Sequence, residues 1–157
     1  ILRLLKDLQA EFDMAILLIT HDLGVVAEIA DRVVVMYAGK VMETGDVYDV
    51  FETPAHPYTS ALLECLPGRG EQMLSIGGSL PSTLDPPDGC RFAPRCPYAV
   101  EDCRVGDQPE LFPVEGRDQR ASCVYYGPGY DSSVVQGSFE AAQNATRDPA
   151  RTDGGEP

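Results

Sequence analysis

The sequence predicts an α/β fold, followed by a small, irregular, cysteine-rich extension and a disordered tail. Helical and strand-like segments alternate over about the first 50 residues, as in α/β proteins. Glycine, proline and serine become frequent from Gly68 onward, and apolar periodicity is almost lost from about Asp131. We therefore expect three units, at residues 1–50, 51–130 and 131–157.

The first 20 residues predict an amphipathic helix and then a buried strand. Apolar residues recur at helical spacing on one face of the first segment, at Ile1, Leu4, Leu5, Leu8 and Phe12. The continuous apolar run from Met14 to Thr20 is typical of a strand covered on both faces in a parallel sheet. A chain that opens within a helix is expected to be the C-terminal part of a longer protein.

The following residues predict a second helix, a hairpin and two more helices. Asp22 suits the N-cap of a helix over residues 23–30. The β-branched run at 32–37 and the turn at 38–40 predict a hairpin that extends to Thr44. The remaining expected elements are a short helix over 47–51 and a helix over 58–66, opened by Pro57 and ended by Pro67.

Composition excludes some functions. The formal net charge of −13 argues against a protein that binds a phosphate backbone, so no nucleic-acid partner is expected. No apolar run approaches the roughly 20 residues needed to span a bilayer. The first residues also lack the basic region and the small-residue cleavage site of a signal peptide.

His21 is the first candidate for a chemical role. It follows the predicted strand directly, and ligands of open α/β sheets bind beyond the carboxyl ends of strands. The stretch LLITHDLGVVAEIADRVVVMYAGKVMETG resembles the end of an ABC-transporter nucleotide-binding domain, with its switch histidine, its A-D-R-V-x-V-M strand and its G-K hairpin. The resemblance implies that the chain is the C-terminal part of a P-loop ABC ATPase that binds ATP and Mg²⁺. It also implies that His21 contacts the γ-phosphate of ATP, where an imidazole can position the attacking water.

Other parts of such an ATPase are missing from the sequence. It contains no G-x-x-x-x-G-K-[ST] phosphate loop, no signature sequence and no strand that ends in Asp-Glu. The backbone amides of a phosphate loop cannot be replaced by Gly39 and Lys40 in a hairpin. We therefore expect this chain alone neither to bind nor to hydrolyse ATP.

Two later stretches resemble one subfamily of these ATPases. FETPAHPYTSALLECLP resembles the P-x-H-P-Y-T-x-x-L extension of the oligopeptide/dipeptide subfamily, and SIGGSLPSTLDPPDGCRFAPRCPYAVEDC resembles its cysteine-rich tail. His56 in the first motif is expected to be structural. The resemblance implies an importer of peptides, with nickel, glutathione and oligosaccharides as known variations of the cargo.

The same resemblance implies partners and a location. The partners are a second ATPase subunit, transmembrane permease subunits and, indirectly, an extracytoplasmic substrate-binding protein. The protein would lie peripherally on the cytoplasmic face of a bacterial or archaeal membrane.

Four cysteines fall in a single proline-rich part of the chain, at Cys90, Cys96, Cys103 and Cys123. An ABC ATPase works in the reducing cytosol, where disulfides are rare, and no histidine lies near these cysteines in sequence to activate one as a nucleophile. A four-thiolate site for Zn²⁺ or for an iron–sulfur cluster is left. Zinc usually uses C-x₂₋₄-C pairs, which are absent here, whereas the wider spacings suit a cubane, and members of the resembled subfamily are associated with a [4Fe–4S] cluster.

Alternatives stay open for this segment and for the whole chain. The cysteine site could hold [4Fe–4S], Zn²⁺ or nothing, and Arg91, Arg95 and Arg104 are expected to offset thiolate charge. A metal would supply folding energy that a segment of low apolar density lacks. The rival for the whole chain is a freestanding cysteine-rich metal-binding module, and a further alternative treats the tail as a regulatory or assembly domain without metal.

Overall fold

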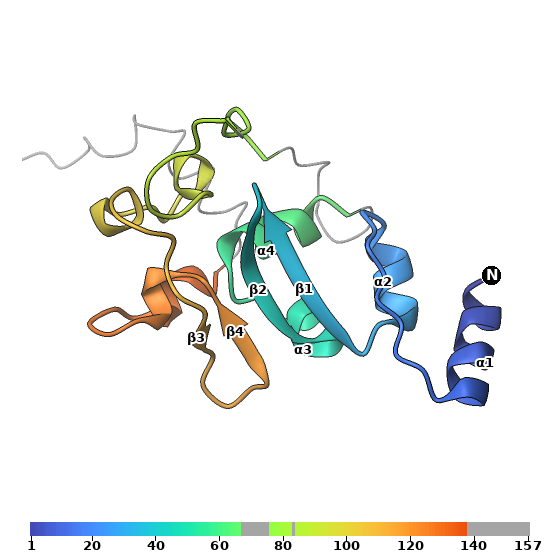
Figure 1. The fold of residues 1–157 in the computed structure, drawn as a ribbon. Helices are drawn as coiled ribbons and strands as arrows, with labels where there is room; N and C mark the ends of the chain where they lie inside the picture. The colour runs from blue at the N-terminus through green and yellow to red at the C-terminus, as the bar shows by residue number, and fades with distance from the viewer. Residues whose placement is uncertain (67–75, 83, 138–157) are drawn as a thin grey trace, which may run out of the picture.

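The computed structural model describes residues 1–66, 76–82 and 84–137. It combines helices with a four-stranded antiparallel sheet in the order β1-β2-β4-β3 (Figure 1). The strands are β1 (Arg32–Tyr37), β2 (Lys40–Asp46), β3 (Phe112–Pro113) and β4 (Gln119–Ala121). None of the helices in this part of the chain is long and apolar enough to cross a membrane.

The two N-terminal helices form where the sequence predicts them. Helix α1 (Leu2–Phe12) lies outside α2 (Leu23–Ile29) in Figure 1, and Lys6 Nζ donates to the Glu28 carbonyl at 2.6 Å. Asp22 caps α2, because its Oδ1 accepts from the backbone N–H groups of Gly24 and Val25 at 2.9 and 3.1 Å. The predicted N-cap is therefore confirmed.

The expected strand from Met14 to Thr20 is wrong for this structure. These residues have no regular secondary structure, and Leu17 and Ile19 are about nine-tenths exposed. A buried parallel strand needs neighbouring strands on both edges to take up its backbone hydrogen bonds. The four strands of the described sheet pair only with one another, so this apolar segment has no ladder to join.

The predicted hairpin is confirmed as β1 and β2. Tyr37 pairs with Lys40, so the loop consists of Ala38 and Gly39, with φ angles of +46° and +78°. Two positive φ angles define the type I′ turn, whose twist matches the twist of the flanking strands. A shift of register between Val35 and Met36 adds a bulge to the ladder.

Helices α3 (Val47–Glu52) and α4 (Pro57–Glu64) follow β2, close to the expected positions. The Asp46 side chain caps α3 by accepting from the Tyr48 N–H at 2.8 Å. Pro67, expected to end α4, lies outside the described residues. Val35, Phe51 and Leu63 bury against each other and so join β1, α3 and α4 into a core cluster.

The extension is less irregular than the sequence predicts. Strand β4 pairs with β2 in antiparallel register, with Glu43 opposite Ala121 and Gly45 opposite Gln119. The hydrogen-bonded sheet therefore runs across the expected boundary at residue 50, and that division stays a prediction. The local sequence did not predict β3 and β4, because both are very short and β4 pairs with β2, which lies more than 70 positions away.

Apolar packing also extends into the cysteine segment, contrary to the expected low apolar density. Phe92 is fully buried and packs with Tyr37 and Met42, while Ala121 and Val135 belong to a second cluster beside it. Residues 132–135 form a 3₁₀ turn, so the first part of the expected disordered tail is structured. The rest of that tail, residues 138–157, lies outside the described residues.

Gly39 provides a test of the hairpin. A Cβ at this position would meet no atom within 4 Å, so an alanine there is opposed only by the backbone conformation. We expect Gly39→Ala to lower the free energy of unfolding by about 1–2 kcal/mol. Gly137→Ala is the control, because its Cβ would meet only Tyr98 Oη at 3.8 Å. Equal stability of the two variants in urea unfolding would contradict the turn assignment.

Candidate metal centre

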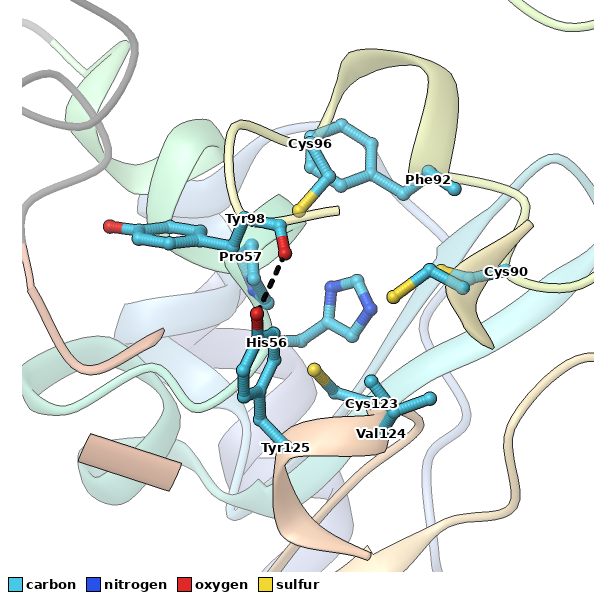
Figure 2. A pocket seen from close by; sticks show the side chains of 11 residues that line it. His56, Pro57, Cys90, Phe92, Cys96, Tyr98, Cys123, Val124 and Tyr125 are labelled. Carbon is cyan, nitrogen blue, oxygen red and sulfur yellow. Dashed lines mark hydrogen bonds between the residues drawn. The ribbon is translucent and has the colours of Figure 1, made fainter. Parts of the chain in front are cut away.

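The structure brings the four predicted cysteines together. Cys90, Cys96, Cys103 and Cys123 all line one pocket, called here the cysteine pocket, together with His56 and several aromatic side chains. Figure 2 shows the sulfur atoms of Cys90, Cys96 and Cys123 pointing toward the space around the His56 ring. Four cysteines spread over 34 positions of sequence, and the histidine that precedes α4, therefore face a common centre.

A backbone pairing places Cys90 beside Cys103. The Cys90 N–H donates to the Cys103 carbonyl at 2.9 Å, and the Gly89 N–H donates to the Gly106 carbonyl at 2.7 Å. Gly89 has φ +67°, and a Cβ there would lie 2.5 Å from the Cys103 carbonyl oxygen. Only glycine meets both constraints, so Gly89 brings these two thiols together.

Short turns position the other two thiols. Cys96 follows the 3₁₀ turn Ala93–Arg95, and Cys123 lies one residue beyond β4, at the start of the turn Val124–Tyr126. Tyr125 Oη donates to the Tyr98 carbonyl at 3.0 Å, the bond drawn in Figure 2. This bond joins the loop after Cys96 to the loop after Cys123.

Burial controls the charge of the thiols. Burial raises the pKa of Cys90, Cys96 and Cys103, and raises the pKa of Cys123 to about 12. The thiols also raise one another's pKa: that of Cys96 is raised by Cys123, Cys90 and Cys103. Without a bound cation the four groups are therefore neutral, and each must lose its proton to act as a ligand.

The expected role of the arginines is only partly seen. The Arg104 charge lowers the pKa of Cys103, against the larger effect of burial. Arg95 instead donates to the carbonyls of Gly77 and Ile76, at 2.9 and 2.5 Å, and to Tyr37 Oη at 3.0 Å. It therefore anchors residues 76–78 to β1 rather than offsetting thiolate charge.

His56 is buried beside the thiols. Its Nδ1 accepts from the Tyr58 N–H at 3.0 Å, so the side chain is the N-cap of α4. Burial lowers the pKa of His56 to about 3, so the imidazole is neutral. The sequence predicted a structural role but not the position in the pocket, because its cysteine neighbours are distant in sequence.

Glu43 holds this histidine from behind. Its carboxylate is completely buried, and its Oε2 accepts from the His56 N–H at 2.8 Å. The other oxygen accepts from the Ala55 N–H at 2.9 Å and from Gln119 Nε2 at 2.5 Å. Burial raises the pKa of Glu43, and the hydrogen bonds from Ala55, His56 and Gln119 lower it. The sequence shows Glu43 only as part of a strand end, with no sign of this role.

The pocket does not have the geometry of a single-ion site. Among the described residues, no group of three or more histidine, cysteine or acidic side chains is close enough to hold one metal ion. The space left between the side chains, about 10 Å³, would admit about one water molecule. What fits a metal group is the donor set, which is four thiols converging in a buried pocket. A larger group would require these side chains to move outward.

His21 lies elsewhere. It is exposed, directly before the α2 cap Asp22, and it does not line the cysteine pocket. Its expected contact with ATP stays a prediction.

Comparison with known proteins shows what this part of the chain is similar to. Residues 42–103 match the family model described as the oligopeptide/dipeptide transporter C-terminal region, a range that includes His56 and three of the four cysteines. The segment that carries α4 and most of the cysteine pocket is therefore similar to that C-terminal region.

Individual relatives are similar over most of the chain. The chain is 46% identical over 128 residues to the dipeptide transport ATP-binding protein DppD of Escherichia coli, covering 80% of this chain and 38% of that protein. It is 48% identical over 129 residues to the oligopeptide transport ATP-binding protein AppD of Bacillus subtilis, covering 80% and 39%. For OppD of Salmonella typhimurium the identity is 50% over 115 residues, covering 71% and 34%. The chain thus spans less than two-fifths of the length of these relatives.

The Glu43 contacts generate a prediction. Glutamine at position 43 would replace one accepting oxygen by an NH₂ group, which faces an N–H donor in either orientation. We expect Glu43→Gln to lower the free energy of unfolding by about 1–3 kcal/mol, the cost of a buried unsatisfied donor. Chemical denaturation measures the change, and Glu115→Gln, at an exposed position, is the control. A Glu43→Gln variant as stable as the control would show that the carboxylate is not needed.

Proposed function

We propose that this chain is the C-terminal part of the ATP-binding subunit of an ABC importer that couples ATP hydrolysis to uptake of peptides. The observation that carries the proposal is the match of residues 42–103 to the transporter C-terminal region. Relatives named as dipeptide and oligopeptide transport ATP-binding proteins support it. The same matches favour an ATPase part over the freestanding metal-binding module.

The partners follow from this role. The subunit would pair with a second ATPase subunit and dock on transmembrane permease subunits at the cytoplasmic face of the membrane. An extracytoplasmic binding protein would deliver the cargo to those permeases. Peptides are the proposed cargo because the relatives' names specify them, and nickel, glutathione or oligosaccharide uptake is the alternative.

The proposed role of His21 concerns the intact ATPase. Its imidazole would hold a γ-phosphate oxygen of ATP and orient the attacking water, which stabilises charge in the transition state. The exposed position of His21 after an unpaired apolar segment supports a site completed by further parts of the subunit. Mg²⁺ and the phosphates would be held by a phosphate loop that this sequence does not contain.

The separation of His21 from the phosphate loop generates a prediction about ATP hydrolysis. The 157-residue chain alone is expected to release no phosphate from Mg²⁺-ATP above the protein-free rate. In the intact subunit, His21→Ala is expected to lower kcat about 10²–10³-fold, as does loss of one preorganised transition-state donor in other enzymes. Phosphate-release assays measure both, with Lys40→Ala as a control that should keep full activity. ATP hydrolysis by the isolated chain would contradict the proposal.

We further propose that the cysteine pocket binds a [4Fe–4S] cluster through Cys90, Cys96, Cys103 and Cys123. Four buried thiols around one centre form the donor set that such a cluster requires. A single Zn²⁺, which needs sulfur atoms about 2.3 Å from one ion, is less well supported because no such grouping is found among the described residues. When bound, the group would supply a covalent cross-link between the 90–103 loops and β4.

The thiols have a matched control in Cys65. Cys65 ends α4 and does not line the pocket. The chain produced and purified without oxygen is expected to contain about four iron and four sulfide ions, with absorption in the visible range. Replacing any pocket cysteine by serine is expected to abolish or strongly reduce both contents, whereas Cys65→Ser should leave them unchanged. Stoichiometric zinc without sulfide, or iron lost equally on Cys65→Ser, would reject the cluster.

A further inference from the structure

We propose that Gln108 is a positioning residue for the cysteine pocket, because its carboxamide holds the chain next to Cys90 and next to Cys123 in one geometry. The inference rests on the proposed metal site and adds to it a residue that is not a ligand. Gln108 lies in a polar loop between Cys103 and β3, and nothing in the local sequence sets it apart.

Both ends of the Gln108 carboxamide are used. Its Oε1 accepts from the backbone N–H of Arg91 at 3.0 Å. Its Nε2 donates to Ser122 Oγ at 2.8 Å and lies 3.9 Å from Met42 Sδ. One half-buried side chain therefore spans the loop after Cys90, the end of β4 and strand β2.

The partners of Gln108 are next to pocket cysteines in the chain. Arg91 follows Cys90, and Ser122 precedes Cys123. Ser122 is itself fixed, because its N–H donates to the Met42 carbonyl at 2.8 Å and its hydroxyl donates to the Pro109 carbonyl at 2.5 Å. The carboxamide thus links Cys90 to Cys123 through a path that is anchored on β2.

Both N–H groups of the Gln108 amide have acceptors, Ser122 Oγ at 2.8 Å and Met42 Sδ at 3.9 Å. An amide nitrogen carries two N–H groups, so its donors are used in full. The geometry therefore assigns Gln108 two effects, on the position of the chain beside Cys90 and on the position of the chain beside Cys123.

Two substitutions separate these effects from folding. Gln108→Leu keeps the approximate volume and removes all hydrogen bonds, whereas Gln108→Glu keeps an acceptor for Arg91 and removes the N–H donor. Gln136→Ala is the matched control. Gln136 is exposed, and its Nε2 makes a long hydrogen bond of 3.5 Å to Ser132 Oγ. The full chain of each variant is produced without oxygen and reconstituted with ferrous iron and sulfide.

Two measurements are compared: the rate at which visible absorption is lost in excess EDTA, and the urea midpoint of the metal-free chain. We expect both Gln108 variants to lose absorption at least about tenfold faster than wild type, since loss of an outer partner of a metal site typically weakens binding 10–100-fold. The metal-free urea midpoint should stay close to that of Gln136→Ala.

The outcomes that overturn the inference are distinct. If wild type binds iron and sulfide but both variants match its loss rate, Gln108 does not position the ligands. If the variants lower the metal-free urea midpoint in proportion to their faster loss, Gln108 is a folding residue only. If wild type binds neither iron nor sulfide, the proposed cluster itself fails, and the inference fails with it.

Discussion

The buried carboxylate of Glu43 is the interaction on which most of the described structure depends. An ion removed from water costs several kcal/mol unless hydrogen bonds replace its hydration. Here the replacements are backbone N–H groups of Ala55 and His56 and the amide of Gln119. Because those donors belong to the chain before α4 and to β4, the carboxylate is satisfied only when both lie against β2. The charge thus selects one arrangement of three segments that are distant in sequence.

The part of the fold that the sequence predicts is the part controlled by neighbouring residues. Asp22 caps its helix because its side chain reaches N–H groups two and three positions ahead, and Gly39 turns the hairpin through its own φ. The run from Met14 to Thr20 failed as a prediction because apolar character indicates burial but not the strand partners that a sheet requires. Strands β3 and β4 were missed because β4 pairs with β2 through contacts far along the chain, and β3 pairs only with β4.

The candidate site divides in the same way. Cysteines can be recognised as candidate ligands by their residue type and spacing. Cys90, Cys96, Cys103 and Cys123 could therefore be predicted from the sequence, and the structure brings them together in one pocket. His56 could be assigned to the start of α4, but its place among the thiols follows from tertiary packing. Gln108 gave no signal at all, since a single glutamine in a polar loop looks like a solvated side chain until its partners are known.

These contacts make the helical motif around His56 and the cysteine segment a single mechanical unit. The histidine caps α4, is held from behind by Glu43 on β2, and faces the thiols. A group bound by the thiols would press on a neutral ring that cannot move without breaking the cap and the Glu43 bond. Binding in the pocket would therefore restrict the motion of α4 and of the β1–β2 hairpin. Through the hairpin it would also restrict α2 and the residues around His21. A group bound in this position would stiffen the segment from α4 to Cys123 against the β1–β2 hairpin, which gives a physical reason for gathering four cysteines beside His56.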